Sequence, residues 1–224
     1  KMINVWGADH HGYVARVKAA MQAFGYNPDN LEVLLLQMVA LYRDGEMVKM
    51  SKRTGQAITL DELMEEVGVD AARYFFLMRS LDSQLDFDIN LAASKSNDNP
   101  VYYIQYAHAR IHSIFNQAKE AGISYGDWEH TSYDSLTADI ELELIKKLAA
   151  YPEEIAQSAL HRAPHRIARY LYDLASMFHS FYKQGRIMGV EPELQQARLG
   201  LITVIANVLK HGLGVLGISA PEKM

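Results

Sequence analysis

The feature that most constrains the fold is a change in hydrophobic pattern near residue 99. Beyond Asn99-Pro100, a capping residue followed by proline at the first helical position, apolar residues recur only at helical spacing. The first of these helices carries an apolar stripe made of Val101, Ile104, His108, Ile111 and Phe115. Further helices are predicted over about 134–150, 153–161, 164–183 and 193–215. The pattern predicts an all-α bundle over residues 97–224.

The first 60 residues have a different pattern, typical of an α/β sheet. A strand is predicted at Ile3–Trp6, followed by a helix from His10 to Phe24 with Asp9 as its N-cap and Gly25 as its stop. The apolar run 31–41 predicts one strand buried on both faces. Asp44-Gly45 is a hairpin signal, so residues 46–50 should return antiparallel to that strand.

Residues 61–96 are interpreted as a link between the two parts. A capping box at Thr59–Glu62 predicts one helix, and Asp70 is predicted to cap a second. Residues 82–98 are polar and rich in turn formers, so they are interpreted as a connector. The chain opens almost directly into a strand, which predicts that it is a piece of something longer.

Composition narrows the class of protein. The 224 residues include no cysteine, which excludes disulfides and thiolate metal sites, and the formal net charge is −5. We find no uninterrupted apolar run of the roughly 20 residues that span a bilayer, and no signal-peptide pattern at the start. We therefore expect a cytoplasmic protein that does not act at a membrane.

The segment Val48–Gly55, VKMSKRTG, gathers three cations in this acidic chain. Lys49 and Lys52, with Ser51 between them, could meet phosphate oxygens and stabilise charge that develops on a phosphoryl group. A solvated basic loop is the alternative, and charge alone favours it. The position of this segment after the predicted hairpin favours the phosphate-binding interpretation.

The segment Gly7–Gly12, GADHHG, follows a strand and opens a helix. Ligands of open α/β sheets bind beyond the carboxyl ends of strands, where Asp9 could accept hydrogen bonds from sugar hydroxyls. In the alternative interpretation Asp9 is only a cap, and His10 and His11 are surface residues. A metal-dependent phosphoesterase of the Asp-His-His type needs further aspartates, which we do not find, so no metal site is predicted.

A third candidate is a group of arginines near residue 164. Arg162, Arg166 and Arg169 have a spacing that would put them on one helical face, with Tyr170 nearby. Such a face suits contacts to RNA phosphates and bases, although a solvated face explains it equally well. Tyr102, Tyr103 and Tyr106 are interpreted as packing residues.

Taken together, these segments resemble the C-terminal portion of bacterial arginyl-tRNA synthetases. VKMSKRTG resembles the KMSKS loop of class I aminoacyl-tRNA synthetases. DAARYFFL and NPVYYIQYAHARI resemble the entry to the DALR-type helical anticodon-binding domain, and LGVLGISAPEKM resembles the end of the family's sequences. The resemblance covers essentially the whole chain. It implies the C-terminal part of a Rossmann-type catalytic domain over 1–60, linking helices over 61–96, and the anticodon-binding domain over 97–224.

The resemblance also implies roles for residues. Lys49, Ser51 and Lys52 would be catalytic, with the lysines on the ATP phosphates. ATP binding would involve Gly7, Asp9, His10, His11, Val48 and Met50. Binding of tRNA would involve Arg53, which stands where the general signature has serine, and the group Arg162, Arg166 and Arg169.

The implied reaction joins arginine to tRNA(Arg) with ATP and Mg²⁺ in the full-length enzyme. No HIGH-type motif occurs in the sequence, so we expect that this chain alone forms no arginyl-adenylate and holds no cofactor tightly. Strands without neighbours could make it self-associate. The principal alternative is a stand-alone helical module that binds tRNA or another RNA.

Overall fold

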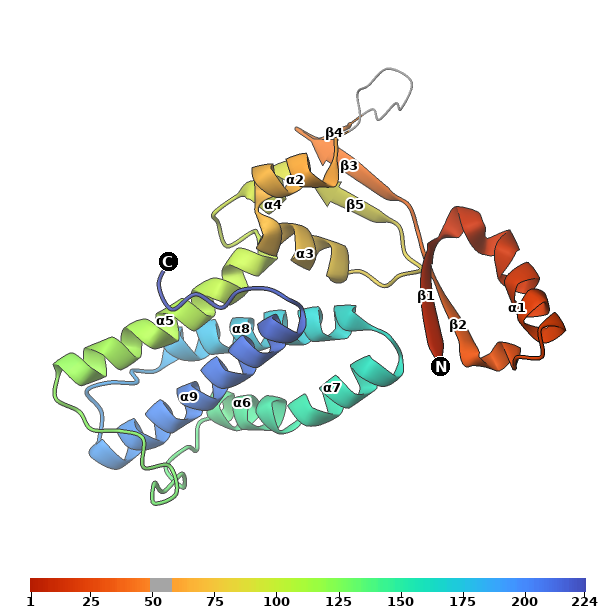
Figure 1. Cartoon of the computed structure of the whole chain (residues 1–224). Coiled ribbons are helices and arrows are strands. Elements are labelled where there is room, and N and C mark those ends of the chain that lie inside the picture. The colour runs from red at the N-terminus through yellow and green to blue at the C-terminus, as the bar shows by residue number, and fades with distance from the viewer. Residues whose placement is uncertain (49–57) are drawn as a thin grey trace. The chain divides into compact units, whose positions relative to one another are not determined.

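The computed structural model describes residues 1–48 and 58–224, and the chain divides into two compact units (Figure 1). The first unit comprises Lys1–Thr59 and Arg79–Asn90. The second comprises Leu60–Met78 and Leu91–Met224. Every described strand belongs to the first unit, and the second is helical, so the predicted order of a small α/β region before a helical bundle is confirmed.

The first unit begins with a strand–helix–strand segment. Its elements are β1 (Met2–Gly7), a 3-10 helix (Ala8–Tyr13), α1 (Val14–Ala23), a 3-10 turn (Pro28–Asn30) and β2 (Leu31–Leu36). The strands pair in parallel, with Met2 opposite Leu31 and Gly7 opposite Leu36. Parallel neighbours need a crossover, which α1 supplies. Gly25 follows the helix at φ +83°, in the left-handed region where glycine is favoured, so the predicted stop is confirmed.

A second sheet has the order β4-β3-β5. Its strands are β3 (Val39–Arg43), β4 (Glu46–Met47) and β5 (Leu85–Asp88). The pair β3-β4 is antiparallel, and Asp44 and Gly45 between them have φ values of 54° and 79°. These positive angles belong to a two-residue hairpin turn, as the sequence predicted. Strand β5 pairs with β3 in parallel.

Three predictions for the first unit were wrong. The run 31–41 forms two strands in different sheets, because the chain breaks at Gln37, whose amide donates to the Leu81 carbonyl (2.9 Å). The connector 82–98 contains strand β5. Asp9 lies inside the 3-10 helix and makes no capping hydrogen bond, because α-helical geometry starts only at Val14.

The second unit is built around α8. Its helices are α2 (Leu60–Val67), α3 (Val69–Leu77), the end of α4 (Ile89–Ala93), α5 (Pro100–Glu120), α6 (Asp139–Ala149), α7 (Tyr151–Leu160), α8 (Pro164–Gln184) and α9 (Pro192–Val215). Helix α8 packs against α5, α6, α7 and α9 (Figure 1). Side chains with no exposed surface at these contacts include Ile104, Ile111, Leu171, Leu174, Phe178, Ile202 and Ile205. The predicted stripe on α5 therefore faces the core.

Two capping predictions had different outcomes. Asn99 caps α5, because its side-chain oxygen accepts from the amide of Val101 (3.2 Å), and Pro100 follows as predicted. Asp70 does not cap α3, whose N-cap is Gly68. The Asp70 carboxylate lies in the first turn and accepts instead from the amide of Ser219 (3.1 Å). A tertiary contact therefore uses a side chain that the local pattern assigned to a cap.

Helix α9 is, among the described residues, the one helix long and apolar enough by length and composition to cross a membrane. Half of its most apolar window is buried inside the structure, and it packs against α5, α6 and α8. Leu199, Ile202 and Ile205 on α9 have no exposed surface. Its apolar character is therefore accounted for by its place in the bundle core.

The close approach of α8 and α9 at Gly212 gives a prediction of stability. A Cβ atom on Gly212 would lie 2.6 Å from a methyl group of the fully buried Leu171. We expect Gly212→Ala to lower the free energy of unfolding by about 1–3 kcal/mol through overpacking. Gly214→Ala is the matched control, since nothing lies within 4 Å of its Cβ position. That control should gain up to ~1 kcal/mol of helix propensity. Urea denaturation of both variants compares them, and equal stabilities would contradict the prediction.

Burial of His108 on α5 predicts a pH dependence. Desolvation lowers the pKa of His108 below its usual value of 6.5, and the positive charges of His112 and Lys210 lower it further. The hydrogen bond with the Pro221 carbonyl and the charge of Glu222 raise the pKa, but they do not offset the desolvation. The neutral form is favoured in the folded state. The free energy of unfolding should therefore fall as pH drops below 6.5, by at most ~1.4 kcal/mol per pH unit for this group.

His108→Asn tests this pH dependence because asparagine can donate to the Pro221 carbonyl but cannot take up a proton. We expect a shallower loss of stability between pH 7.5 and pH 5.5 in urea denaturation of this variant. Parallel pH profiles for the variant and the unsubstituted chain would contradict the assignment to His108.

Candidate nucleic-acid interface

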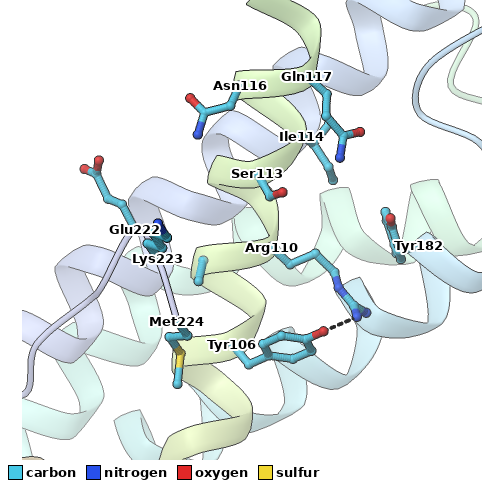
Figure 2. Close-up of a pocket in the computed structure, with 11 residues that line it drawn as sticks. Tyr106, Arg110, Ser113, Ile114, Asn116, Gln117, Tyr182, Glu222, Lys223 and Met224 are labelled. Atoms are coloured by element: carbon cyan, nitrogen blue, oxygen red, sulfur yellow. Dashed lines mark hydrogen bonds between the residues drawn. The ribbon is translucent and has the colours of Figure 1, made fainter. Parts of the chain in front are cut away.

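A cavity of about 460 Å³ lies along α5 in the second unit (Figure 2). Helix α5 contributes Tyr106, Arg110, Ser113 and Gln117, which follow one another at intervals of three or four residues and share one face. The remaining walls include Tyr182 of α8 and the segment Glu222, Lys223 and Met224. The buried stripe of α5 fixes the rotation of the helix, which turns this second stripe toward the cavity.

Arg110 is held between two aromatic rings in this cavity. Its guanidinium carbon lies 4.5 Å from the centre of the Tyr106 ring and 4.8 Å from that of Tyr182. The guanidinium also donates a hydrogen bond to the Tyr106 hydroxyl, drawn as a dashed line in Figure 2. Tyr106 in turn stacks on Tyr102, with ring centres 6.2 Å apart and planes 13° apart. The contacts hold a cation and two flat surfaces in fixed positions.

Such an arrangement suits unpaired nucleotides. Bases of single-stranded RNA stack on aromatic rings and on guanidinium planes, and their edges accept hydrogen bonds from arginine. Ser113, Asn116 and Gln117 are exposed at the same cavity and can both donate and accept hydrogen bonds. The cavity therefore offers stacking surface, positive charge and polar groups that could recognise the edge of a base.

A second cavity, of about 400 Å³, lies beside the first half of α8. Its lining consists of Lys147, Glu154, His165, Arg166, Arg169, Tyr170 and Asp173. Most of these charges are already paired. Glu154 accepts two hydrogen bonds from Arg166 (2.8 and 3.0 Å), and Lys147 lies 3.2 Å from Asp173. Burial raises the pKa of Tyr170, whose hydroxyl donates to the Lys147 carbonyl (2.6 Å).

The structure corrects the predicted arginine face. Arg162 lies in the turn before α8 at φ 54°, and its guanidinium donates to the Ala159 carbonyl. Arg166 is on α8, but the bidentate pair with Glu154 offsets its charge. Arg169 is exposed, and the described residues give its guanidinium no hydrogen-bond or ion-pair partner. Of the three arginines, Arg169 has the charge most available to a ligand.

At the start of the chain, the segment Gly7–Gly12 lies at the carboxyl end of β1, where the sequence predicted a ligand. The Asp9 carboxylate is about two-thirds exposed and lies 3.7 Å from the ring of His10. A Cβ atom on Gly7 would come within 2.5 Å of that carboxylate, so a larger residue at position 7 would require the Asp9 side chain to move. Across residues 1–48 and 58–224, no three potential metal ligands group together.

Of the predicted loop residues 48–53, only Val48 is described. Lys49, Met50, Ser51, Lys52 and Arg53 lie outside the described residues. The amide of Val48 donates to the Leu41 carbonyl (2.8 Å), so the hairpin already uses this N–H group.

Sequence reasoning missed the cavity on α5. Tyr106 was interpreted as a packing residue, and Arg110 and Tyr182 were not selected. The spacing of Tyr106 and Arg110, four residues apart on a predicted helix, could have indicated a stacked pair. Tyr182 and residues 222–224 are distant in sequence, and no local pattern brings them to this site.

Comparisons with known proteins identify the family of the second unit. A family model, the DALR anticodon binding domain, matches residues 104–224, which include every residue lining both cavities. An arginine–tRNA ligase of Carboxydothermus hydrogenoformans is 56% identical over 223 residues, which cover all of this chain and 40% of the relative. The chain therefore spans about 40% of the length of the curated relatives it matches.

Solved structures give the same result. A structure assigned as an arginyl-tRNA synthetase from Campylobacter jejuni matches with a TM-score of 0.89 and 39% identity, over all of this chain and 48% of that one. The Thermus thermophilus arginyl-tRNA synthetase matches with a TM-score of 0.81 and 27% identity, over all of this chain and 41% of that one. The chain belongs to the DALR anticodon binding domain family, in the form that arginine–tRNA ligases contain.

Proposed function

We propose that this chain is the tRNA-binding part of an arginine–tRNA ligase and that the cavity on α5 receives unpaired bases of the tRNA(Arg) anticodon loop. The observation that carries this proposal is Arg110, held between Tyr106 and Tyr182 inside the region that matches an anticodon-binding family. Support for tRNA(Arg) as the ligand comes from curated relatives named arginine–tRNA ligase.

The first unit is proposed to be the C-terminal part of a Rossmann-type catalytic domain. Support comes from the parallel β1-α1-β2 segment, with Gly7 at the carboxyl end of β1 and Asp9 just beyond it. In the full-length ligase, ATP with Mg²⁺ and arginine would form arginyl-adenylate, with His10, His11, Val48 and Met50 near the nucleotide. Lys49, Ser51 and Lys52 stay predicted catalytic residues, and Arg53 stays a predicted tRNA contact. The site of action would be the cytoplasm.

Self-association of the isolated chain also stays a proposal. Strand β1 presents Ile3 and Val5 with 44% and 60% of their surface exposed, and Phe24 at the end of α1 is 81% exposed. In the described residues, β1 and β2 form a two-stranded sheet, so each has a strand edge without a neighbour. A stand-alone RNA-binding module is the weaker alternative, because the matched relatives are longer ligases.

Substitution of Arg110 tests the proposed cavity. We expect Arg110→Ala to weaken binding of tRNA(Arg) about tenfold or more, because stacking and cation–π contacts are worth ~1–3 kcal/mol per base. Arg110→Lys should lose part of the affinity, since an ammonium keeps the charge but not the plane. Filter binding at one fixed salt concentration provides the measurement.

Lys146→Ala is the control for loss of one positive charge. The Lys146 side chain is 72% exposed on α6 and pairs with Glu143, outside both cavities. The Lys146→Ala variant should bind tRNA(Arg) with the affinity of the unsubstituted chain. Equal affinities for Arg110→Ala and Lys146→Ala would sink the assignment of the α5 cavity.

Charge reversal at Arg169 tests the second cavity. If Arg169 contacts a phosphate, Arg169→Glu should weaken tRNA(Arg) binding. It should also make the slope of log affinity against log salt concentration shallower, by the amount expected for the loss of about one phosphate contact. Arg166→Glu is less informative, because it breaks the pair with Glu154 and leaves two carboxylates together. A salt slope unchanged in Arg169→Glu would mean that this face is only solvated.

A further inference from the structure

Residues 216–224, here named the C-terminal strap, leave α9, and the last three of them form one wall of the α5 cavity. The helix ends where the amide of Leu216 donates to the Gly212 carbonyl (3.2 Å) and that of Ile218 donates to the Leu213 carbonyl (2.9 Å). Gly217 between them has φ +70°, which reverses the chain out of the helix. The path of the strap beyond this turn depends on side chains of α3 and α5.

Helix α3 fastens the beginning of the strap at two points. The Asp70 carboxylate accepts hydrogen bonds from the amide and the hydroxyl of Ser219, and from the side-chain amide of Gln105 (2.8 Å). Arg73 donates from Nε to the Leu216 carbonyl (3.0 Å). A Cβ atom on Gly217 would lie 2.5 Å from the Arg73 guanidinium, so the absence of a side chain at Gly217 allows the guanidinium to lie this close to the strap.

Helix α5 continues the attachment at successive turns. The Gln105 side chain donates to the Ser219 carbonyl (3.0 Å), and His108 Nδ1 lies 2.8 Å from the Pro221 carbonyl. His112 follows, 3.8 Å from the Glu222 carboxylate. The seven-residue step from Gln105 to His112 rises ~10.5 Å along α5. An extended chain spans that distance in about three residues, which matches the step from Ser219 to Glu222. The strap therefore runs extended and parallel to α5, with its spacing matched to the turns of the helix.

The last two residues of the strap, Lys223 and Met224, have no hydrogen-bond or ion-pair partner among the described residues, but they line the cavity. Glu222, Lys223 and Met224 are exposed, and they face the same space as Tyr106 and Arg110. Ordering a free segment costs conformational entropy, which would reduce the affinity for any ligand that needs the segment ordered. Attachment at residues 216–222 limits that cost before a ligand arrives.

We propose that Asp70 and Arg73 of α3 are positioning residues for RNA binding, because they hold the strap that forms a wall of the α5 cavity. This inference rests on the proposed tRNA-binding function. Neither residue lines the cavity, so both act through the strap. Weakening their contacts should loosen residues 216–224 and lower RNA affinity while Tyr106 and Arg110 keep their stacking contacts.

The first test measures strap opening without RNA. The chain has no cysteine, so Ile218→Cys introduces a single thiol at a position that is 4% exposed on the strap. We expect maleimide labelling of this thiol to be at least tenfold faster when Asp70→Ala or Arg73→Ala is added. Ser219→Ala removes only the hydroxyl contact and should give a smaller acceleration.

A second thiol separates local opening from unfolding. Ala197→Cys lies on α9 at a fully buried position. Its labelling rate should not change when Asp70→Ala is added. Unchanged labelling of Ile218→Cys would overturn the proposal, and so would an equal acceleration at both thiols, since that would show a general loss of stability.

The second test couples the strap to RNA. We expect Asp70→Ala to bind tRNA(Arg) about tenfold more weakly, and saturating tRNA(Arg) to slow the labelling of Ile218→Cys by a similar factor, because such coupling is reciprocal. Normal tRNA affinity in Asp70→Ala, despite rapid labelling, would overturn the positioning role. Failure of the unsubstituted chain to bind tRNA(Arg) would instead overturn the proposed function, while the labelling rates would still report whether Asp70 and Arg73 hold the strap.

Discussion

Burial of the apolar face of α8 is the constraint on which the second unit depends. Leu171, Leu174 and Phe178 have no exposed surface, and the helix packs against α5, α6, α7 and α9. Once this face is buried, the remaining faces of α8 are fixed in direction. One end supplies Arg166 and Arg169 to the second cavity, and the other supplies Tyr182 to the cavity on α5. Hydrophobic packing thus places the polar residues that are proposed to meet RNA.

The charges of the second unit indicate how an acidic chain could bind an anionic partner. Several cations are paired within the fold, including Arg166 with Glu154, Lys147 with Asp173, and Arg198 with the buried Glu141. Such pairs add little long-range attraction for a phosphate backbone. Stacking on Tyr106 and Tyr182, with the local charge of Arg110, does not depend on net charge. Affinity is therefore expected to depend on the shape of the cavity, including the wall formed by the strap.

Much of the fold could be predicted from sequence because its signals are local. The Asn99-Pro100 start of α5, the Asp44-Gly45 hairpin and the Gly25 stop each depend on the conformations of a few adjacent residues. Several errors arose where partners are distant in sequence. Strand β5 was missed because its pairing with β3 depends on a neighbour about 46 residues away. The proposed site was only partly predicted, since its residues come from α5, α8 and the strap.

The sequence by itself determined the order of an α/β region and a helical bundle, the approximate helices, and the resemblance to arginyl-tRNA synthetases. Periodicity, caps and motifs are properties of short segments, so they can be read without a structure. Only the tertiary structure decided that Asp70 binds Ser219, 149 residues away, rather than capping its own helix. It also decided that Arg110 lies between Tyr106 and Tyr182, and that Glu154 offsets the charge of Arg166. A polar side chain can satisfy its hydrogen bonds with many partners, and packing of the surrounding helices selects which one lies within reach.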